Sequence, residues 1–79
     1  MFIISKKFGC PYCDQLKHWL ESKGHYIDTK YAEDNMDFCR QHNIRQVPTL
    51  VYERAEKNGS VAMCFIHGFD DIKKFMENL

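Results

Sequence analysis

Hydrophobic and polar residues alternate along this chain in blocks that predict a series of short strands and helices. The apolar run Phe2-Ile3-Ile4, which ends in polar residues, is typical of a buried strand. Apolar positions at helical spacing follow from Pro11, which suits the first turn of a helix, to Gly24, a natural C-terminal stop. The loose alternation from His25 to Lys30 predicts a second strand.

The second half of the chain predicts a helix, a hairpin and a closing helix. The first of these helices is expected over Glu33 to His42. Pro48 opens the β-rich run Thr49-Leu50-Val51-Tyr52, and the Asn-Gly pair within Glu56–Gly59 predicts a hairpin turn. Val61 to Ile66 is the expected returning strand. The final helix has apolar residues at i, i+3, i+4 and i+7, namely Ile72, Phe75, Met76 and Leu79.

The resulting order, β-α-β-α-β-β-α, predicts an α/β domain. An initial βαβ unit is followed by a hairpin and a closing helix, so the four-stranded sheet should be mixed, with helices on its faces. At 79 residues, of which 44% are hydrophobic, the chain is expected to form one domain (1–79) around one compact core.

The charge balance excludes some partners. Eleven basic residues offset eleven acidic ones, which gives no electrostatic footprint for nucleic acid or for a membrane surface. The first residues are too short an apolar stretch for a signal peptide, and no segment approaches the length of a membrane span. We therefore expect a soluble cytoplasmic protein that has no nucleic-acid or membrane partner and is a monomer.

The candidate chemistry lies in two cysteines, Cys10 and Cys13, separated by Pro11-Tyr12. Cys10 follows the first predicted strand, where the unpaired N–H groups of a helix start favour a thiolate. Such settings lower the pKa of a cysteine from about 8.5 to roughly 3.5–7.5, and Lys6 and Lys7 lie close enough in sequence to add positive charge. Cys13 lies one turn into the helix and should be less exposed. The pattern predicts thiol–disulfide exchange, with Cys13 as the resolving thiol.

Other uses of a C-x-x-C pair fit this chain less well. A zinc site needs four ligands, but Cys39 and Cys64 are isolated and the histidines form no ligand pattern, so no metal is expected. A structural disulfide framework needs a secreted context. Cys39 and Cys64 are expected to be small core hydrophobes, with a regulatory second disulfide as the alternative.

Three motifs together resemble the glutaredoxin family, in order, at the family's spacing and over essentially the whole chain. They are Cys10-Pro11-Tyr12-Cys13, Val47-Pro48 and Gly68-Phe69-Asp70-Asp71. The resemblance implies a thioredoxin fold, in which three helices flank the mixed four-stranded sheet. It also implies a dithiol oxidoreductase that reduces protein disulfides or glutathione mixed disulfides. Glutathione would be its reductant, and no cofactor would be bound permanently.

The resemblance further implies roles for single residues around the nucleophile Cys10. Lys7 would hold the glycyl carboxylate of glutathione, and Tyr12 would line the groove. Val47 would offer backbone hydrogen bonds to the cysteinyl part, beside a cis Pro48. From the residues alone, a proline at the start of a strand is expected to be trans, since cis is a small minority of X–Pro bonds.

Phe69 and Asp70, at the start of the last helix, would hold the γ-glutamyl end of glutathione. This agrees with physical chemistry, because a helix N-terminus binds a carboxylate and an aspartate suits an ammonium group.

Two positions depart from the family pattern and support an alternative. Gln46 stands where threonine is usual, and His67-Gly68 replaces Gly-Gly. The segment Ile44–Pro48 also resembles glutaredoxin-like redoxins that donate electrons to ribonucleotide reductase and are recharged by thioredoxin reductase. An iron–sulfur carrier is a further alternative, against which Pro11 argues because related carriers usually have a smaller residue there. The intact cysteine pair argues against a third alternative, a non-catalytic binding module.

Overall fold

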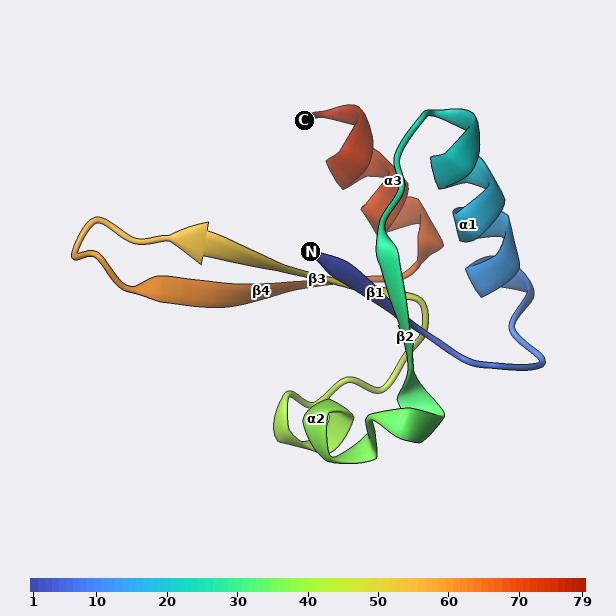
Figure 1. Cartoon of the computed structure of the whole chain (residues 1–79), viewed down its shortest axis with the longest axis horizontal. Helices are drawn as coiled ribbons and strands as arrows, with labels where there is room; N and C mark the ends of the chain where they lie inside the picture. The colour runs from blue at the N-terminus through green and yellow to red at the C-terminus, as the bar shows by residue number, and fades with distance from the viewer.

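The computed structural model describes residues 1–79 and contains the predicted elements in the predicted order (Figure 1). One short 3-10 turn, η1, is added before the second helix. The bounds are β1 (Phe2–Ser5), α1 (Pro11–Ser22), β2 (Asp28–Tyr31), η1 (Ala32–Asp34), α2 (Met36–Gln41), β3 (Thr49–Ala55), β4 (Val61–His67) and α3 (Phe69–Glu77). None of the helices has the length and apolar character needed to cross a lipid bilayer.

The four strands form one mixed sheet in the order β2-β1-β3-β4. β1 and β2 are parallel, and their last residues, Ser5 and Tyr31, lie opposite each other. β3 is antiparallel to both β1 and β4. The parallel pair comes from the βαβ unit and the antiparallel pair from the hairpin, so the mixed sheet expected from the element order is confirmed.

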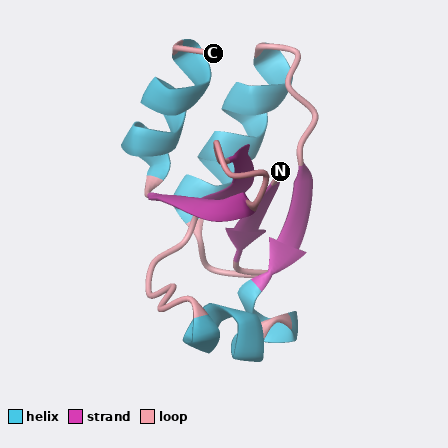
Figure 2. Ribbon diagram, turned by 90° about the vertical axis from the view of Figure 1, so that its left-hand side faces the viewer, coloured by secondary structure: helices cyan, strands magenta, loops and turns pink.

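Helices cover both faces of this sheet, with α1 and α3 side by side on one face and α2 on the other (Figure 2). Successive residues of a strand point to opposite faces, and each face therefore has its own core. The larger cluster, under α1 and α3, consists of Ile3, Leu16, Leu20, Leu50, Ile72 and Met76. The smaller cluster, on the α2 side, consists of Ile4, Cys39 and Val51. This architecture is the thioredoxin fold in its glutaredoxin-like form, as the resemblance implied.

The predicted bounds of the second strand and of the last helix are wrong. The second strand covers Asp28–Tyr31 rather than His25–Lys30, and all four of its residues are exposed because β2 is an edge strand that pairs only with β1. At the other end of the chain, α3 stops before Leu79, which is exposed. The buried stripe of α3 therefore consists of Ile72 and Met76.

The helix expected over Glu33 to His42 is interrupted at Asn35. The Asn35 side chain donates a hydrogen bond to the carbonyl of Tyr31 at 2.8 Å, which holds the backbone in a turn between η1 and α2. Consequently Met36 is exposed and does not share the buried face of Cys39.

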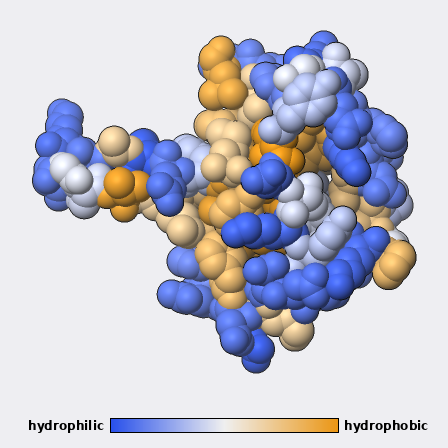
Figure 3. Space-filling view, viewed as in Figure 1, coloured by the Kyte–Doolittle hydropathy of each residue, from blue (hydrophilic) through white to orange (hydrophobic).

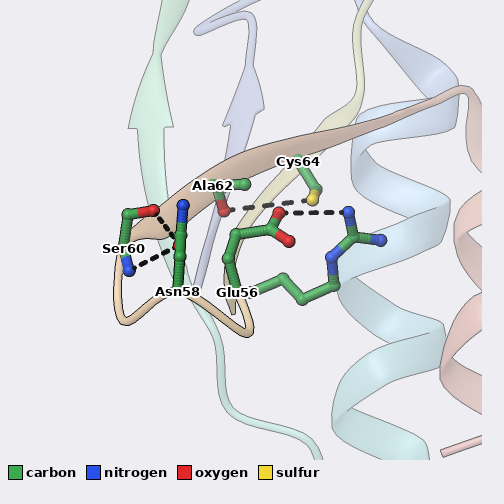
Figure 4. Close-up of polar contacts among 6 residues, drawn as sticks. Glu56, Asn58, Ser60, Ala62 and Cys64 are labelled. Carbon is green, nitrogen blue, oxygen red and sulfur yellow. Dashed lines mark hydrogen bonds and ion pairs between the residues drawn. The ribbon is translucent and has the colours of Figure 1, made fainter.

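The hairpin is longer than expected, because β3 continues past Tyr52 to Ala55 and projects from the body of the molecule (Figure 1). Its tip is largely hydrophilic (Figure 3). The predicted turn is confirmed: the N–H of Glu56 donates to the carbonyl of Ser60 at 2.8 Å. The Asn58 side chain accepts from the N–H of Ser60 at 3.1 Å (Figure 4).

Candidate active site

Cys10 and Cys13 are joined by a disulfide at the start of α1, with their Cα atoms 5.3 Å apart. The helix begins at Pro11, as predicted, and Cys10 is the residue that caps it. The backbone N–H of Cys13 donates to the Cys10 sulfur at 3.2 Å. An N–H group that points at this sulfur, together with the helix dipole, favours a thiolate at Cys10 once the disulfide is reduced.

The two cysteines differ in exposure. The Cys13 residue is only 7% exposed, whereas Cys10 is half-buried and is followed by the exposed Pro11 and Tyr12. Because exchange requires access for the partner sulfur, this geometry offers the Cys10 sulfur to an incoming substrate.

A groove of about 330 Å³ runs along the end of the molecule where β3 starts and β4 ends. The residues that line it are Tyr12, Gln46, Val47, Pro48, His67, Gly68, Phe69, Asp70 and Asp71. The groove brings together five of the six residues expected to bind glutathione, all except Lys7. The rings of Tyr12 and Phe69 lie 6.0 Å apart between centroids, so two aromatic side chains stand together at this site.

The wall of the groove is built from the segment before β3 and from the start of α3. The Val47–Pro48 peptide bond is cis, as the family resemblance implied. The trans bond expected from the residues alone is therefore wrong. The N–H of Gly68 donates to the carbonyl of Pro48 at 2.9 Å, which ties the two segments together. Val47 forms no hydrogen bond with another backbone group, so its N–H and C=O remain available to a ligand.

Position 68 requires a glycine because of its backbone conformation and because the Gln46 side chain lies close to it. Its φ of +93° is a conformation that side chains rarely adopt, and a Cβ there would lie 2.8 Å from the amide nitrogen of Gln46. The two departures from the family pattern, Gln46 and His67-Gly68, therefore meet in space at one wall of the groove.

A buried hydroxyl connects His67 to the same wall. Thr49 is fully buried, and its hydroxyl donates to the carbonyl of Gln46 at 2.7 Å. The same oxygen lies 3.0 Å from Nδ1 of His67. A hydroxyl has one proton, so the His67 Nδ1–H is the donor in the second bond, and Nε2 is the ring nitrogen left for a ligand. The sequence marked Gln46 and His67 only as departures, because a position in the groove has no local signal.

Lys7 is not among the residues that line the groove. Its amine forms an ion pair with Asp34 at 3.0 Å, and its backbone N–H donates to the Glu33 carboxylate at 3.0 Å. This backbone hydrogen bond is the main reason why the pKa of Glu33 is lowered. Lys7 lines a second hollow of about 280 Å³, which lies between α1 and β2 and also reaches Cys13 and Tyr31. Its expected contact with a glycyl carboxylate stays a prediction.

The other two cysteines are free thiols. Cys39 is buried against Ile4 and Val51, which confirms it as a small core residue, and burial raises the pKa of its thiol. Cys64 is half-buried on β4 (Figure 4). Burial, followed by a hydrogen bond with Cys64, raises the pKa of Tyr52. No group of three or more histidine, cysteine, aspartate or glutamate side chains is placed to hold a metal ion.

The chain matches no protein-family model, no curated protein and no solved structure. The functional argument therefore rests on the fold and on the geometry around α1. A C-x-x-C disulfide at the first turn of a helix that follows the first strand of a thioredoxin fold indicates a thiol–disulfide redox protein.

Proposed function

We propose that this chain is a dithiol oxidoreductase that reduces protein disulfides or glutathione mixed disulfides and draws its electrons from glutathione. The observation that carries the proposal is the position of the Cys10–Cys13 disulfide at the start of α1, the helix whose exposed Tyr12 also lines the groove. The shape and chemistry of that groove support glutathione as the reductant.

The reaction uses the two sulfurs in sequence. In the reduced protein the Cys10 thiolate attacks one sulfur of a substrate disulfide, forms a mixed disulfide and releases the other sulfur as a thiolate. The Cys13 sulfur then attacks Cys10, releases the second substrate thiolate and forms the Cys10–Cys13 disulfide. One glutathione thiolate opens this disulfide at Cys10, and a second removes the first as glutathione disulfide. Two glutathione molecules are oxidised for each substrate disulfide reduced.

The groove offers complementary groups for a short peptide thiol. The free backbone N–H and C=O of Val47 pair with the cysteinyl part of glutathione, as one strand pairs with another. The start of α3 presents unpaired N–H groups to the γ-glutamyl carboxylate, and Asp70 receives its ammonium group. The rings of Tyr12 and Phe69 cover the apolar part of the ligand.

A comparison of electron sources tests this proposal. NADPH oxidation with hydroxyethyl disulfide is followed first with glutathione plus glutathione reductase, then with thioredoxin reductase alone. We expect turnover with glutathione, and loss of that turnover in Cys10→Ser. Cys13→Ser is the matched variant, because it removes the other sulfur and should abolish only reactions that need an intramolecular disulfide. Turnover with thioredoxin reductase alone would refute the proposal.

One observation favours a second candidate, a redoxin that is recharged by thioredoxin reductase and donates electrons to ribonucleotide reductase. Lys7, the residue expected to hold the glycyl carboxylate, is paired with Asp34 and lies outside the groove. Weak binding of glutathione would follow from this arrangement, and the same comparison of electron sources separates the two candidates.

A further inference from the structure

The loop that leads from β1 to the active site is held at two points by η1. The Lys7 amine contacts both carboxylate oxygens of Asp34, at 3.0 and 3.1 Å, while its backbone N–H is bound to Glu33. The centroid of the Tyr31 ring lies 6.0 Å from the nitrogen of the Lys7 amine. Asp34 thus contacts the charged group that stands three residues before the nucleophilic Cys10.

The topology of the sheet brings these residues together across 27 positions of sequence. β1 and β2 are parallel and end opposite each other, with Ser5 beside Tyr31. The segments that follow two parallel strands leave the same edge of a sheet, so Lys7 and η1 meet there. The hydrogen bond from the Asn35 side chain to the Tyr31 carbonyl joins the two residues that flank η1, the turn that contains Asp34.

We propose that Asp34 is a specificity-determining residue, an internal carboxylate that competes with the substrate's own carboxylate for Lys7. The inference rests on the proposed function, in which glutathione is the reductant, and on the role that the family resemblance implies for Lys7, which would receive the glycyl carboxylate. A ligand carboxylate must displace Asp34 or share the ammonium group with it, and two carboxylates on one ammonium group repel each other. Asp34 therefore weakens the binding of glutathione.

The competition discriminates between two classes of substrate. In glutathione the residue after cysteine ends in a free carboxylate. In a protein disulfide the residue after cysteine is followed by a neutral peptide bond, so it has no terminal carboxylate that would pair with Lys7. Asp34 thus favours protein disulfides over small peptide thiols whose terminal carboxylate follows directly after the reacting cysteine. The selectivity arises because Asp34 weakens the binding of one class of ligand.

The test compares Asp34→Asn with Asp37→Asn. Asp37 makes a matched control, because it is an exposed aspartate one turn further along that pairs with Arg40 and does not contact Lys7. We expect Asp34→Asn to lower KM for glutathione by about 1.5- to 5-fold, the range that an exposed ion pair contributes. kcat, and the rate of insulin disulfide reduction, should stay unchanged. The effect should shrink as salt is added, and Asp37→Asn should show none of it.

A double-mutant cycle identifies the group through which Asp34 acts. In a Lys7→Gln background, Asp34→Asn should no longer change KM, because the contested ammonium group is absent. An equal decrease in KM for Asp34→Asn and Asp37→Asn would overturn the proposal, as would an effect that survives in the Lys7→Gln background, since either result indicates a general charge effect.

A binding measurement separates this proposal from the proposed function. S-methylglutathione, which cannot exchange, is titrated into the oxidised protein and followed by NMR. If glutathione supports turnover but Asp34→Asn changes neither KM nor binding, the inference fails while the function stands. If wild type does not turn over with glutathione but Asp34→Asn binds S-methylglutathione more tightly than Asp37→Asn, the function fails and the inference stands. If wild type does not turn over with glutathione and neither variant binds S-methylglutathione, both fail.

Discussion

Replacing Thr49 with valine removes one hydroxyl and nearly preserves the shape of the side chain. Thr49 is fully buried, and its oxygen makes two hydrogen bonds, to the Gln46 carbonyl at 2.7 Å and with Nδ1 of His67 at 3.0 Å. One oxygen atom therefore links the Gln46 carbonyl, in the wall of the groove before Pro48, to the His67 ring at the end of β4.

The expected loss of stability follows from these two bonds. A net hydrogen bond contributes about 0.5–1.5 kcal/mol, and both partners of Thr49 belong to residues that water reaches, so neither is left wholly unsatisfied. We expect Thr49→Val to lower the free energy of unfolding by about 1–2 kcal/mol. For a domain of this size, each kcal/mol lowers the melting temperature by about 4–8 °C.

The assay uses the single tryptophan of the chain, Trp19, which is half-buried against the larger core and reports unfolding in urea by its fluorescence. Thr29→Val is the control, because it makes the same chemical change on the exposed edge strand β2 and should alter stability by no more than about 0.5 kcal/mol. If Thr49→Val unfolds at the same urea concentration as Thr29→Val, the two hydrogen bonds of the buried hydroxyl do not stabilise the fold, which refutes the prediction.

Three further results are expected. Gly68→Ala should cost about 1–3 kcal/mol of stability, measured by urea unfolding, because alanine is strained at φ +93° and its Cβ would meet Gln46; an unchanged midpoint would contradict this. The pKa of Glu33 is lowered by its contact with Lys7, so the carboxylate stabilises the fold above pH 4.5, its ordinary pKa, and this contribution is lost as the pH falls below that value. Thermal unfolding as a function of pH should therefore show a shallower acid loss in Glu33→Gln than in wild type. Because burial raises the pKa of Cys39, iodoacetamide should leave this thiol unmodified in the reduced, folded protein and alkylate it in urea; rapid labelling of the folded protein, read by mass spectrometry, would count against that burial.

The elements that the sequence predicted well are those specified by local interactions. Pro11 begins α1 because a proline suits a first helical turn, and Gly59, whose φ is +88°, allows the chain to turn between β3 and β4. The buried stripe of α3 was visible in the spacing of Ile72 and Met76. Each of these features depends on residues within a few positions of one another.

The boundaries that were missed have no such local origin. Hydrophobic periodicity in a sequence arises from the burial of one face of an element. β2 lies at the exposed edge of the sheet and has no buried residue, so its sequence carries no such pattern. The break at Asn35 coincides with a hydrogen bond to the Tyr31 carbonyl, which the pattern that predicted a helix over Glu33 to His42 does not reveal.

The sequence by itself determined the chemistry of this protein, because Cys10 and Cys13 need only a two-residue spacer and a helix start to form a redox-active pair. Only the tertiary structure decided what surrounds that pair. The groove is assembled from α1, the segment before β3 and the start of α3, and the contact between Lys7 and Asp34 depends on the parallel alignment of β1 with β2. Such contacts join residues far apart in the chain, and their partners are chosen by the packing of the sheet and its helices rather than by any local pattern.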